Sequence, residues 1–356
     1  MVIGDGGLDA WLDRVACVRA AESVLREVFL DRGYREVNLP AIEEAEDRLV
    51  PRGGGQGGFA GGAGPAAARD GEGAYRFLDQ EGRVWALRAD VTPGLARLLW
   101  SRDADGPRPR RLFYMAEVYR RVPGQRGPVA LLQVGVEVVG TRGPGEDAGI
   151  LSLAAVALRS LGLTRFQLSV GHVGLLKEIL SEAGLGPEER DQILAALQAR
   201  DYVKLHSLIA AVLPEKEAHR LTQFLTWRGR AAALLGVLPA LGIPGDKARA
   251  ALEDLRGLLE ACGEENNVFV DLGLVRDRTY YTGMVFEMCV PGLSQPAGGG
   301  GRYDGVLSPE PATGFAFDLG AVLAVAPVGA ATGPAGGRGP WPAVTVGGRL
   351  QVAAIH

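Results

Sequence analysis

Cysteine is scarce in this chain, and long apolar runs are missing. The 356 residues include three cysteines, Cys17, Cys262 and Cys289. They are odd in number and far apart, so the sequence predicts neither a disulfide framework nor a CxxC metal site. No apolar stretch reaches the ~18 residues of a membrane span, and the N-terminus lacks the pattern of a signal peptide. We therefore expect a folded cytoplasmic protein.

An excess of basic residues is also missing. The 38 Lys and Arg residues stand against 42 Asp and Glu, which gives a net charge of -4. This balance provides no general attraction to phosphate backbones, so we expect no nucleic-acid binding. The hydrophobic fraction of 47% and the charged fraction of 22% are those of a globular protein. The length allows one large domain with a smaller one inserted or appended.

Histidine is rare as well, and its spacing does not suggest a metal site. The four residues are His172, His206, His219 and His356. We interpret them as packing or surface residues, and we expect neither a metal nor another cofactor. Glycine, by contrast, is abundant. It gathers in Gly53 to Gly64 and Gly329 to Gly339, whose Gly and Pro content predicts a flexible loop or tail. A phosphate-binding loop at Gly53 to Gly55 is not expected, because no Lys-Ser/Thr follows and no strand precedes it.

Apolar periodicity divides the chain into sheet-rich and helical parts. Helical spacing over residues 9–32 predicts a long helix that stops at Gly33, and alternation predicts a following strand ended by Pro40. Further strand patterns are Tyr75–Leu78, Val84–Leu87, Arg111–Arg120, Val129–Gly140, Phe166–Val170, Val268–Leu272 and Met284–Val290. Between about residues 173 and 261, the spacing of apolar residues is helical throughout.

These patterns predict an α+β protein. We expect an antiparallel sheet of six or seven strands, flanked by helices and interrupted in sequence by a helical insertion. The expected parts are the first portion of the sheet domain, the insertion, the second portion and a Gly/Pro-rich tail, at residues 1–172, 173–261, 262–325 and 326–356.

Three segments carry polar residues in otherwise apolar surroundings. Gln133 and Glu137 are four apart and share one face of a strand, where they could receive a donor-rich ligand or form a solvated face. The segment 275–287 places arginines and tyrosines between two strands. Its Arg forks suit a carboxylate, although it could equally be a surface loop covering the sheet edge.

The third segment is a run of glycines followed by polar residues. In Gly298 to Gly305 the backbone could approach a ligand closely, and Arg302, Tyr303 and Asp304 would add polar contacts. The alternative is an ordinary turn between strands.

Together these segments resemble the histidyl-tRNA synthetases, a class II family. Leu87 to Pro93 is similar to their substrate-loop motif. Tyr119-Arg120 with Gln133 to Glu137 is similar to motif 2, and Leu274 to Glu287 with Gly299 to Gly305 to the two histidine-specific signatures. The helix from Val15 to Leu30, continued to Pro40, is similar to motif 1.

The resemblance implies a class II synthetase-like fold and a pocket for histidine. The positions that would hold histidine are Asp90, Arg120, Gln133, Glu137, Arg276, Tyr280 and Tyr281. Carboxylates would accept from the α-amino group and the imidazole, and an Arg would face the carboxylate. The chain departs from the family at Asp90, a shorter carboxylate than Glu, and at Ala89, where Pro is common.

Other family features are missing. No acidic residue lies between Arg120 and Glu137, and the motif 3-like stretch Gly314 to Leu323 has no Arg, so the residues that read adenine and hold ATP phosphates are absent. Only about thirty residues follow, too few for an anticodon-reading domain.

This combination resembles the regulatory subunits of ATP phosphoribosyltransferase. It implies a non-catalytic protein that serves the first step of histidine biosynthesis and its feedback inhibition by histidine. The implied partner is a short-form catalytic subunit, a glycosyltransferase, and the implied assembly is a homodimer within a hetero-oligomer. The alternatives are a truncated or atypical histidyl-tRNA synthetase and a histidine-binding interaction protein.

Overall fold

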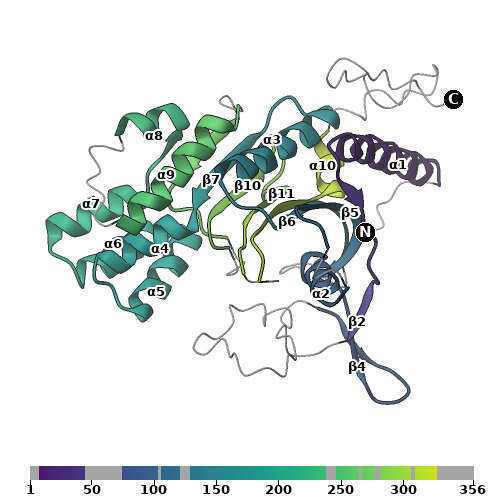
Figure 1. Cartoon of the computed structure of the whole chain (residues 1–356), viewed down its shortest axis with the longest axis horizontal. Coiled ribbons are helices and arrows are strands. Elements are labelled where there is room, and N and C mark those ends of the chain that lie inside the picture. Colours follow the sequence, from purple (N-terminus) through teal and green to yellow (C-terminus); the bar gives the residue numbers. More distant parts are fainter. Residues whose placement is uncertain are drawn as a thin grey trace.

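The computed structural model describes residues 8–44, 74–102, 106–120, 129–237, 246–263, 267–276, 281–305 and 309–326. Within these residues the chain forms a nine-stranded sheet, a separate three-stranded sheet and ten helices (Figure 1). The α+β class predicted from the sequence is confirmed. Both Gly-rich runs, 53–64 and 329–339, lie outside the described residues.

The N-terminal helix and strand lead into the main sheet. Helix α1 (Leu8–Leu30) buries Leu25 and Phe29 fully and ends before Gly33, whose positive φ of 78° is a conformation that glycine adopts without strain. The Phe29 ring packs against Phe113 with centroids 5.2 Å apart. Strand β1 (Arg35–Glu36) then pairs parallel with β5 (Arg110–Arg120).

The main sheet has the order β1-β5-β6-β12-β11-β10-β7-β9-β8. After β1 its strands are β5 (Arg110–Arg120), β6 (Val129–Val139), β12 (Ala312–Asp318), β11 (Gly298–Arg302), β10 (Met284–Cys289), β7 (Gln167–His172), β9 (Val268–Asp271) and β8 (Arg228–Arg230). Neighbours are antiparallel except in the pairs β1–β5 and β7–β9.

The predicted count of six or seven strands is therefore wrong, whereas the predicted antiparallel pairing holds for six of the eight neighbouring strand pairs. Strand β8 has only three residues, too few for alternation to be recognised, and it lies in the segment expected to be entirely helical. Strand β11 consists of four glycines and an arginine, which carry no apolar pattern. The glycine run is thus an inner strand of the sheet and not a turn.

Helices cover the sheet and extend beyond it. Helix α3 (Pro144–Ser160) packs against α1, β12 and α9, and α10 (Leu319–Val325) packs against β6. The segment predicted to be helical holds α4 (Val173–Glu182), α5 (Pro187–Gln198), α6 (Tyr202–Ala210), α7 (Glu215–Leu225), α8 (Ala231–Val237) and α9 (Asp246–Ala261). Among the described residues, no helix is both long and apolar enough to span a bilayer.

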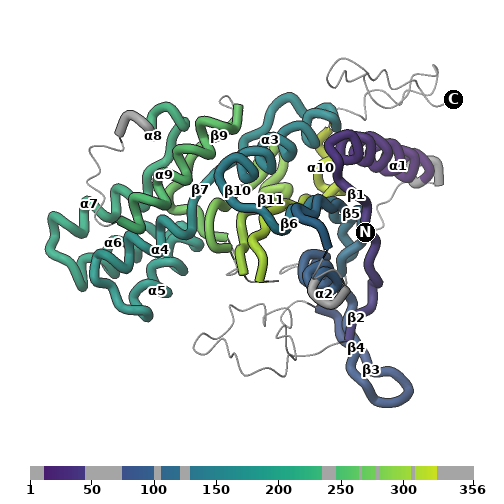
Figure 2. The backbone as a smooth tube through the Cα atoms, viewed as in Figure 1, coloured from purple at the N-terminus to yellow at the C-terminus, as the bar shows by residue number. Residues whose placement is uncertain are grey.

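The second sheet forms an arm that projects from the body (Figure 2). Its strands β2 (Ile42–Glu44), β3 (Arg76–Leu78) and β4 (Val84–Leu87) have the order β2-β4-β3. The predicted hairpin is confirmed as β3 and β4. Strand β4 runs on, through four residues, into helix α2 (Thr92–Arg102).

Candidate functional site

A cavity of about 430 Å³ lies on one face of the main sheet. It is lined by residues from β5, β6, β11 and β12, from the start of α2 and from two loops that flank β10. The lining residues of interest are Asp90, Thr92, Arg120, Gln133, Glu137, Arg276, Tyr281, Leu293, Ser294, Gln295, Tyr303, Phe315, Phe317 and Ala321. Its size is that of a small-molecule site.

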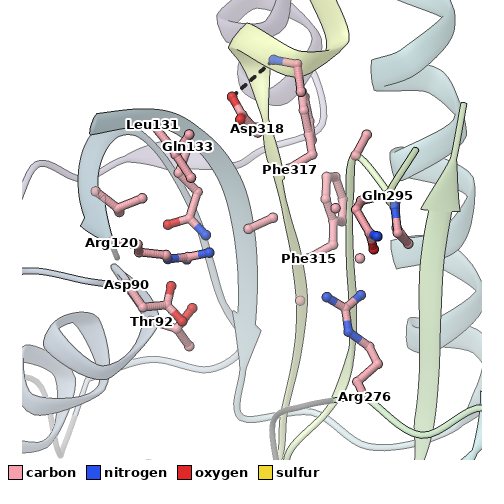
Figure 3. A pocket seen from close by; sticks show the side chains of 18 of the residues that line it. Asp90, Thr92, Arg120, Leu131, Gln133, Arg276, Gln295, Phe315, Phe317 and Asp318 are labelled. Carbon is pink, nitrogen blue, oxygen red and sulfur yellow. Dashed lines mark hydrogen bonds between the residues drawn. The ribbon is translucent and has the colours of Figure 1, made fainter. Parts of the chain in front are cut away.

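Six of the seven residues predicted to hold histidine line this cavity. They are Asp90, Arg120, Gln133, Glu137, Arg276 and Tyr281. Figure 3 shows Asp90, Arg120 and Gln133 gathered at one side, with Arg276 across the cavity. The seventh, Tyr280, lies outside the described residues. The structure thus brings together residues separated by up to 191 positions in the sequence.

Glu137 is the most deeply buried charge of the site. It is 3% exposed, and its two carboxylate oxygens accept hydrogen bonds from two hydroxyls. Thr92 Oγ1 donates to Oε1 at 2.6 Å, and the Tyr303 hydroxyl donates to Oε2. Since hydrogen bonds to an ionised acceptor are strong, these donors fix the orientation of the carboxylate. Neither Thr92 nor Tyr303 was among the predicted histidine-binding residues.

Glycines make room for the charged side chains. A Cβ at Gly314 would overlap the Glu137 carboxylate, and a Cβ at Gly299 would overlap the Arg276 guanidinium. Both charged groups therefore lie directly on the backbone of the sheet. Within the glycine run, the Arg276 side chain approaches the backbone at Gly299, and the close approach of a ligand to this run stays a prediction.

Arg276 is anchored by one contact and offers its other donors to the cavity. Its Nη1 donates to the Phe286 carbonyl oxygen at 2.7 Å, and Figure 3 shows the guanidinium directed into the cavity. A guanidinium has five donors in a planar fork, so those beyond the Phe286 contact suit a carboxylate.

The opposite wall combines an acid, a base and an amide. Asp90 Oδ1 accepts from the Val91 amide at 2.8 Å, and Arg120 Nε donates to the Ala89 carbonyl at 2.6 Å. Gln133 Oε1 is buried and has no hydrogen-bond partner among the described residues. Because buried polar atoms are normally satisfied, this oxygen indicates that a ligand donor belongs at this wall.

Among the described residues, the end of the cavity next to helix α10 carries no basic group. It is formed by Phe317, Asp318 and Ala321, whereas Gln295, from the loop after β10, lies beside Arg276 (Figure 3). The segment 309–326, which supplies β12 and α10, contains no Lys or Arg. Asp318 caps its own helix, because its Oδ1 accepts from the Ala321 amide at 3.2 Å (Figure 3).

Two of the polar residues expected near a ligand point elsewhere. Arg302 forms a bidentate ion pair with Asp147 of α3, at 2.9 and 2.8 Å, and contacts Asp304 at 2.9 Å. Successive strand residues point to opposite faces, so Tyr303 reaches the cavity while its neighbour Arg302 does not. Burial raises the pKa of Asp147 even though Arg302 opposes that shift.

The described histidines also have structural surroundings. His172 caps α4, where its Nδ1 accepts from the Leu175 amide at 3.0 Å. Burial lowers its pKa to about 4, which keeps the ring neutral and Nδ1 free to accept. His206 contacts the Thr222 hydroxyl at 3.2 Å. The assignment to packing holds for His172, and His356 lies outside the described residues.

Comparisons with known proteins show which family the chain is similar to. The histidyl-tRNA synthetase family profile matches residues 8–322. An ATP phosphoribosyltransferase regulatory subunit of Symbiobacterium thermophilum is 37% identical over 90% of this chain and 79% of its own length. That of Moorella thermoacetica is 37% identical over 85% and 76%, respectively. A crystal structure from Bacillus halodurans, described as an ATP phosphoribosyltransferase regulatory subunit/histidyl-tRNA synthetase, is 28% identical with a TM-score of 0.74, covering 87% of this chain and 79% of that one.

Proposed function

This chain belongs to the histidyl-tRNA synthetase family, and we propose that within it the chain acts as the non-catalytic regulatory subunit of ATP phosphoribosyltransferase. The name shared by relatives that cover most of the chain supports the role and its pathway, the first step of histidine biosynthesis. The implied partner is the short-form catalytic subunit.

The observation that carries the proposal is the difference between the two ends of one pocket. One end gathers Asp90, Glu137 and Arg276, the charges that an amino acid zwitterion with a donor-bearing ring requires. Among the described residues, the other end presents Ala321 and the Asp318 carboxylate but no basic side chain, so it offers no positive charge to stabilise a transferring polyphosphate. Such a pocket can bind histidine without activating it.

We also propose the details of histidine binding. Arg276 faces the carboxylate, Asp90 and Gln133 accept from the α-amino group, and Glu137 accepts from the imidazole. The donor that satisfies the buried Gln133 Oε1 is then the ammonium of the ligand. Isothermal titration calorimetry with histidine tests this assignment, and histidinol, which lacks the carboxylate, should bind far more weakly.

A twofold homodimer through α1 and β1 is part of the proposal. Leu12 and Val15 near the start of α1 are exposed, as expected of residues that a second copy would cover. Light scattering of the purified chain should give twice the mass of 37.5 kDa.

The decisive experiment is co-purification with a short-form ATP phosphoribosyltransferase catalytic subunit, followed by assay of the complex with and without histidine. We expect a stable complex that histidine inhibits. In parallel, histidine-dependent pyrophosphate exchange by the chain alone should stay at background. Measurable exchange would favour the atypical synthetase, and histidine binding without complex formation would favour a separate histidine-binding interaction protein. Val122, part of the motif 2-like loop, lies outside the described residues.

A further inference from the structure

Arg88 is a buried charge that the pocket does not use. The residue is only 7% exposed. Among the described residues, no carboxylate forms an ion pair with its guanidinium. Instead it donates to backbone carbonyls. Nε binds the Glu117 oxygen at 2.7 Å, and Nη1 binds the Leu39 oxygen at 2.6 Å and the Pro40 oxygen at 3.4 Å. Burying a charge is costly, so a guanidinium held in this way has a positional role that an apolar side chain could not take.

The backbone of Arg88 connects the same segments. Its amide donates to the Ala41 carbonyl at 2.9 Å, next to β2, and its carbonyl accepts from the Tyr119 amide at 2.9 Å, in β5. Side chain and backbone together therefore tie residues 39–41 at the base of the arm to residues 117–119 of the main sheet. Strand β4 of the arm ends at the preceding residue, Leu87.

These contacts of Arg88 with residues 39–41 and 117–119, called the Arg88 junction below, lie next to one wall of the pocket. Asp90 follows Arg88 by two residues, and Arg120 follows Tyr119 directly. Arg120 Nε donates to the Ala89 carbonyl at 2.6 Å, and its own carbonyl accepts from the Tyr75 hydroxyl at 3.4 Å, just before β3 of the arm. The hydrogen bonds of Arg88, Tyr119 and Arg120 thus position Asp90, Arg120 and the arm together.

The arm has little packing of its own. Leu78 is 68% exposed, and Ile42, Phe77 and Val84 are also exposed. Small sheets with so little buried apolar surface are marginally stable, so their order depends on what holds their base. In this arm, the base is the Arg88 junction.

We propose that Arg88 is a positioning residue that couples the arm sheet to the pocket, so that a ligand contacting Asp90 and Arg120 stabilises the arm. Local unfolding free energies are linked to binding, because a ligand that selects one arrangement of the junction suppresses openings that disrupt it. The ligand used to test this is histidine, and that choice rests on the proposed function.

Hydrogen exchange of the full-length protein, read by mass spectrometry, tests the coupling directly. In the wild type, histidine should slow exchange in peptides of the arm, residues 76–87, as well as in those that line the pocket. The variant Arg88→Lys keeps the charge but cannot span the Glu117 and Leu39 carbonyls. Without histidine, its arm should exchange faster than that of the wild type, and histidine should no longer protect the arm. Its histidine affinity should fall by about three- to ten-fold.

Arg83→Lys is the matched control. Arg83 is an exposed arginine of the same hairpin whose hydrogen bonds go to Asp79 and Glu81 at the turn, away from the junction. It should leave both histidine affinity and the protection of the arm base at wild-type levels.

The outcomes separate this inference from the proposed function. If calorimetry shows that histidine binds and the wild-type arm is not protected, the coupling is refuted while the histidine pocket stands. If histidine does not bind, the proposed ligand is wrong, and the ligand-free comparison still decides the role of Arg88: unchanged exchange in Arg88→Lys overturns it, and faster arm exchange supports it. The wild-type measurement needs no variant, so a poorly folded Arg88→Lys protein does not block the test.

Discussion

The two ends of the pocket differ in how firmly hydrogen bonds hold the side chains that line them. At the charged end, Glu137 is held by the Thr92 and Tyr303 hydroxyls, and Arg276 by the Phe286 carbonyl above a glycine backbone. At the other end, called neutral here because its described residues include no basic one, Ala321 needs no polar partner for its side chain and Asp318 caps its own helix. Buried charges are tolerated only where hydrogen bonds and geometry support them. The charged end is therefore a pre-organised site, whereas the neutral end has no comparable network.

This difference indicates which end of the pocket determines its selectivity among ligands. A ligand that matches the fixed charges gains energy without reorganising the protein, so removing one fixed group should be costly. Changes at the neutral end should matter only for a ligand long enough to reach it. Each substitution below tests one side of this comparison.

The largest effect on binding is expected from Arg276→Ala. This substitution removes the guanidinium that faces the ligand carboxylate, and a hydrogen bond to a charged group is worth about 1.5 to 3 kcal/mol. Histidine affinity should fall by roughly ten- to a hundred-fold, measured by calorimetry. Through linkage, inhibition of the assembled enzyme by histidine should weaken as well.

Arg256→Ala is a suitable control, because Arg256 is an exposed arginine of α9 that pairs with Glu253. It should not change affinity. Unchanged affinity and unchanged inhibition in Arg276→Ala would place the histidine sensor elsewhere, for example at the subunit interface.

A somewhat smaller loss is expected from Gly299→Ala. The added methyl group would occupy the position of the Arg276 guanidinium and displace it from the Phe286 carbonyl. Affinity should fall by about ten-fold, corresponding to roughly 1.4 kcal/mol. If the methyl acts through Arg276, the double variant Gly299→Ala/Arg276→Ala should bind no more weakly than Arg276→Ala alone.

The control for this substitution is Gly145→Ala in the first turn of α3, where a Cβ would meet nothing within 4 Å. Gly299 also lies close to the Phe286 carbonyl, so thermal unfolding should accompany the titrations. Fully additive losses in the double variant would show that the clash is with the strand backbone and not with Arg276.

Tyr303→Phe tests the support of Glu137. The ring stays buried, but one of the two hydroxyl donors to the carboxylate is lost. The carboxylate becomes less well oriented, and histidine affinity should fall by about three- to ten-fold. Tyr119→Phe removes a comparable tyrosine–glutamate bond outside the pocket, to Glu117 at 2.9 Å, and should have no effect. Equal affinities for both variants would argue against a role for the hydroxyl in positioning.

The sequence predicted the long elements and most of the charged end. Apolar periodicity predicted helix α1, the β3–β4 hairpin and the strands β5 and β6. Gln133 and Glu137, four residues apart in β6, share one strand face because side chains alternate between the two faces. Short strands such as β8 and the glycine strand β11 carry no such pattern. Tyr303 could have been assigned to the pocket, and Arg302 away from it, only once β11 was known to be a strand. Whether residues 173–261 fold as an independent insertion stays a prediction.

The smallest effect is expected at the neutral end, from Ala321→Leu. Ala321 lies in α10, where leucine has a good helical propensity, and it lines the cavity away from Arg276 and Glu137. If histidine is held by the charged end, a larger apolar side chain here should change its affinity by about two-fold or less, roughly 0.4 kcal/mol. Calorimetry under the conditions used for Arg276→Ala gives the comparison. A ten-fold loss would mean that the bound ligand spans the whole cavity, and the site would then have to be assigned to a molecule longer than histidine. An unchanged affinity for histidine, together with the large loss in Arg276→Ala, would confine recognition to the end where the fold supports its charges.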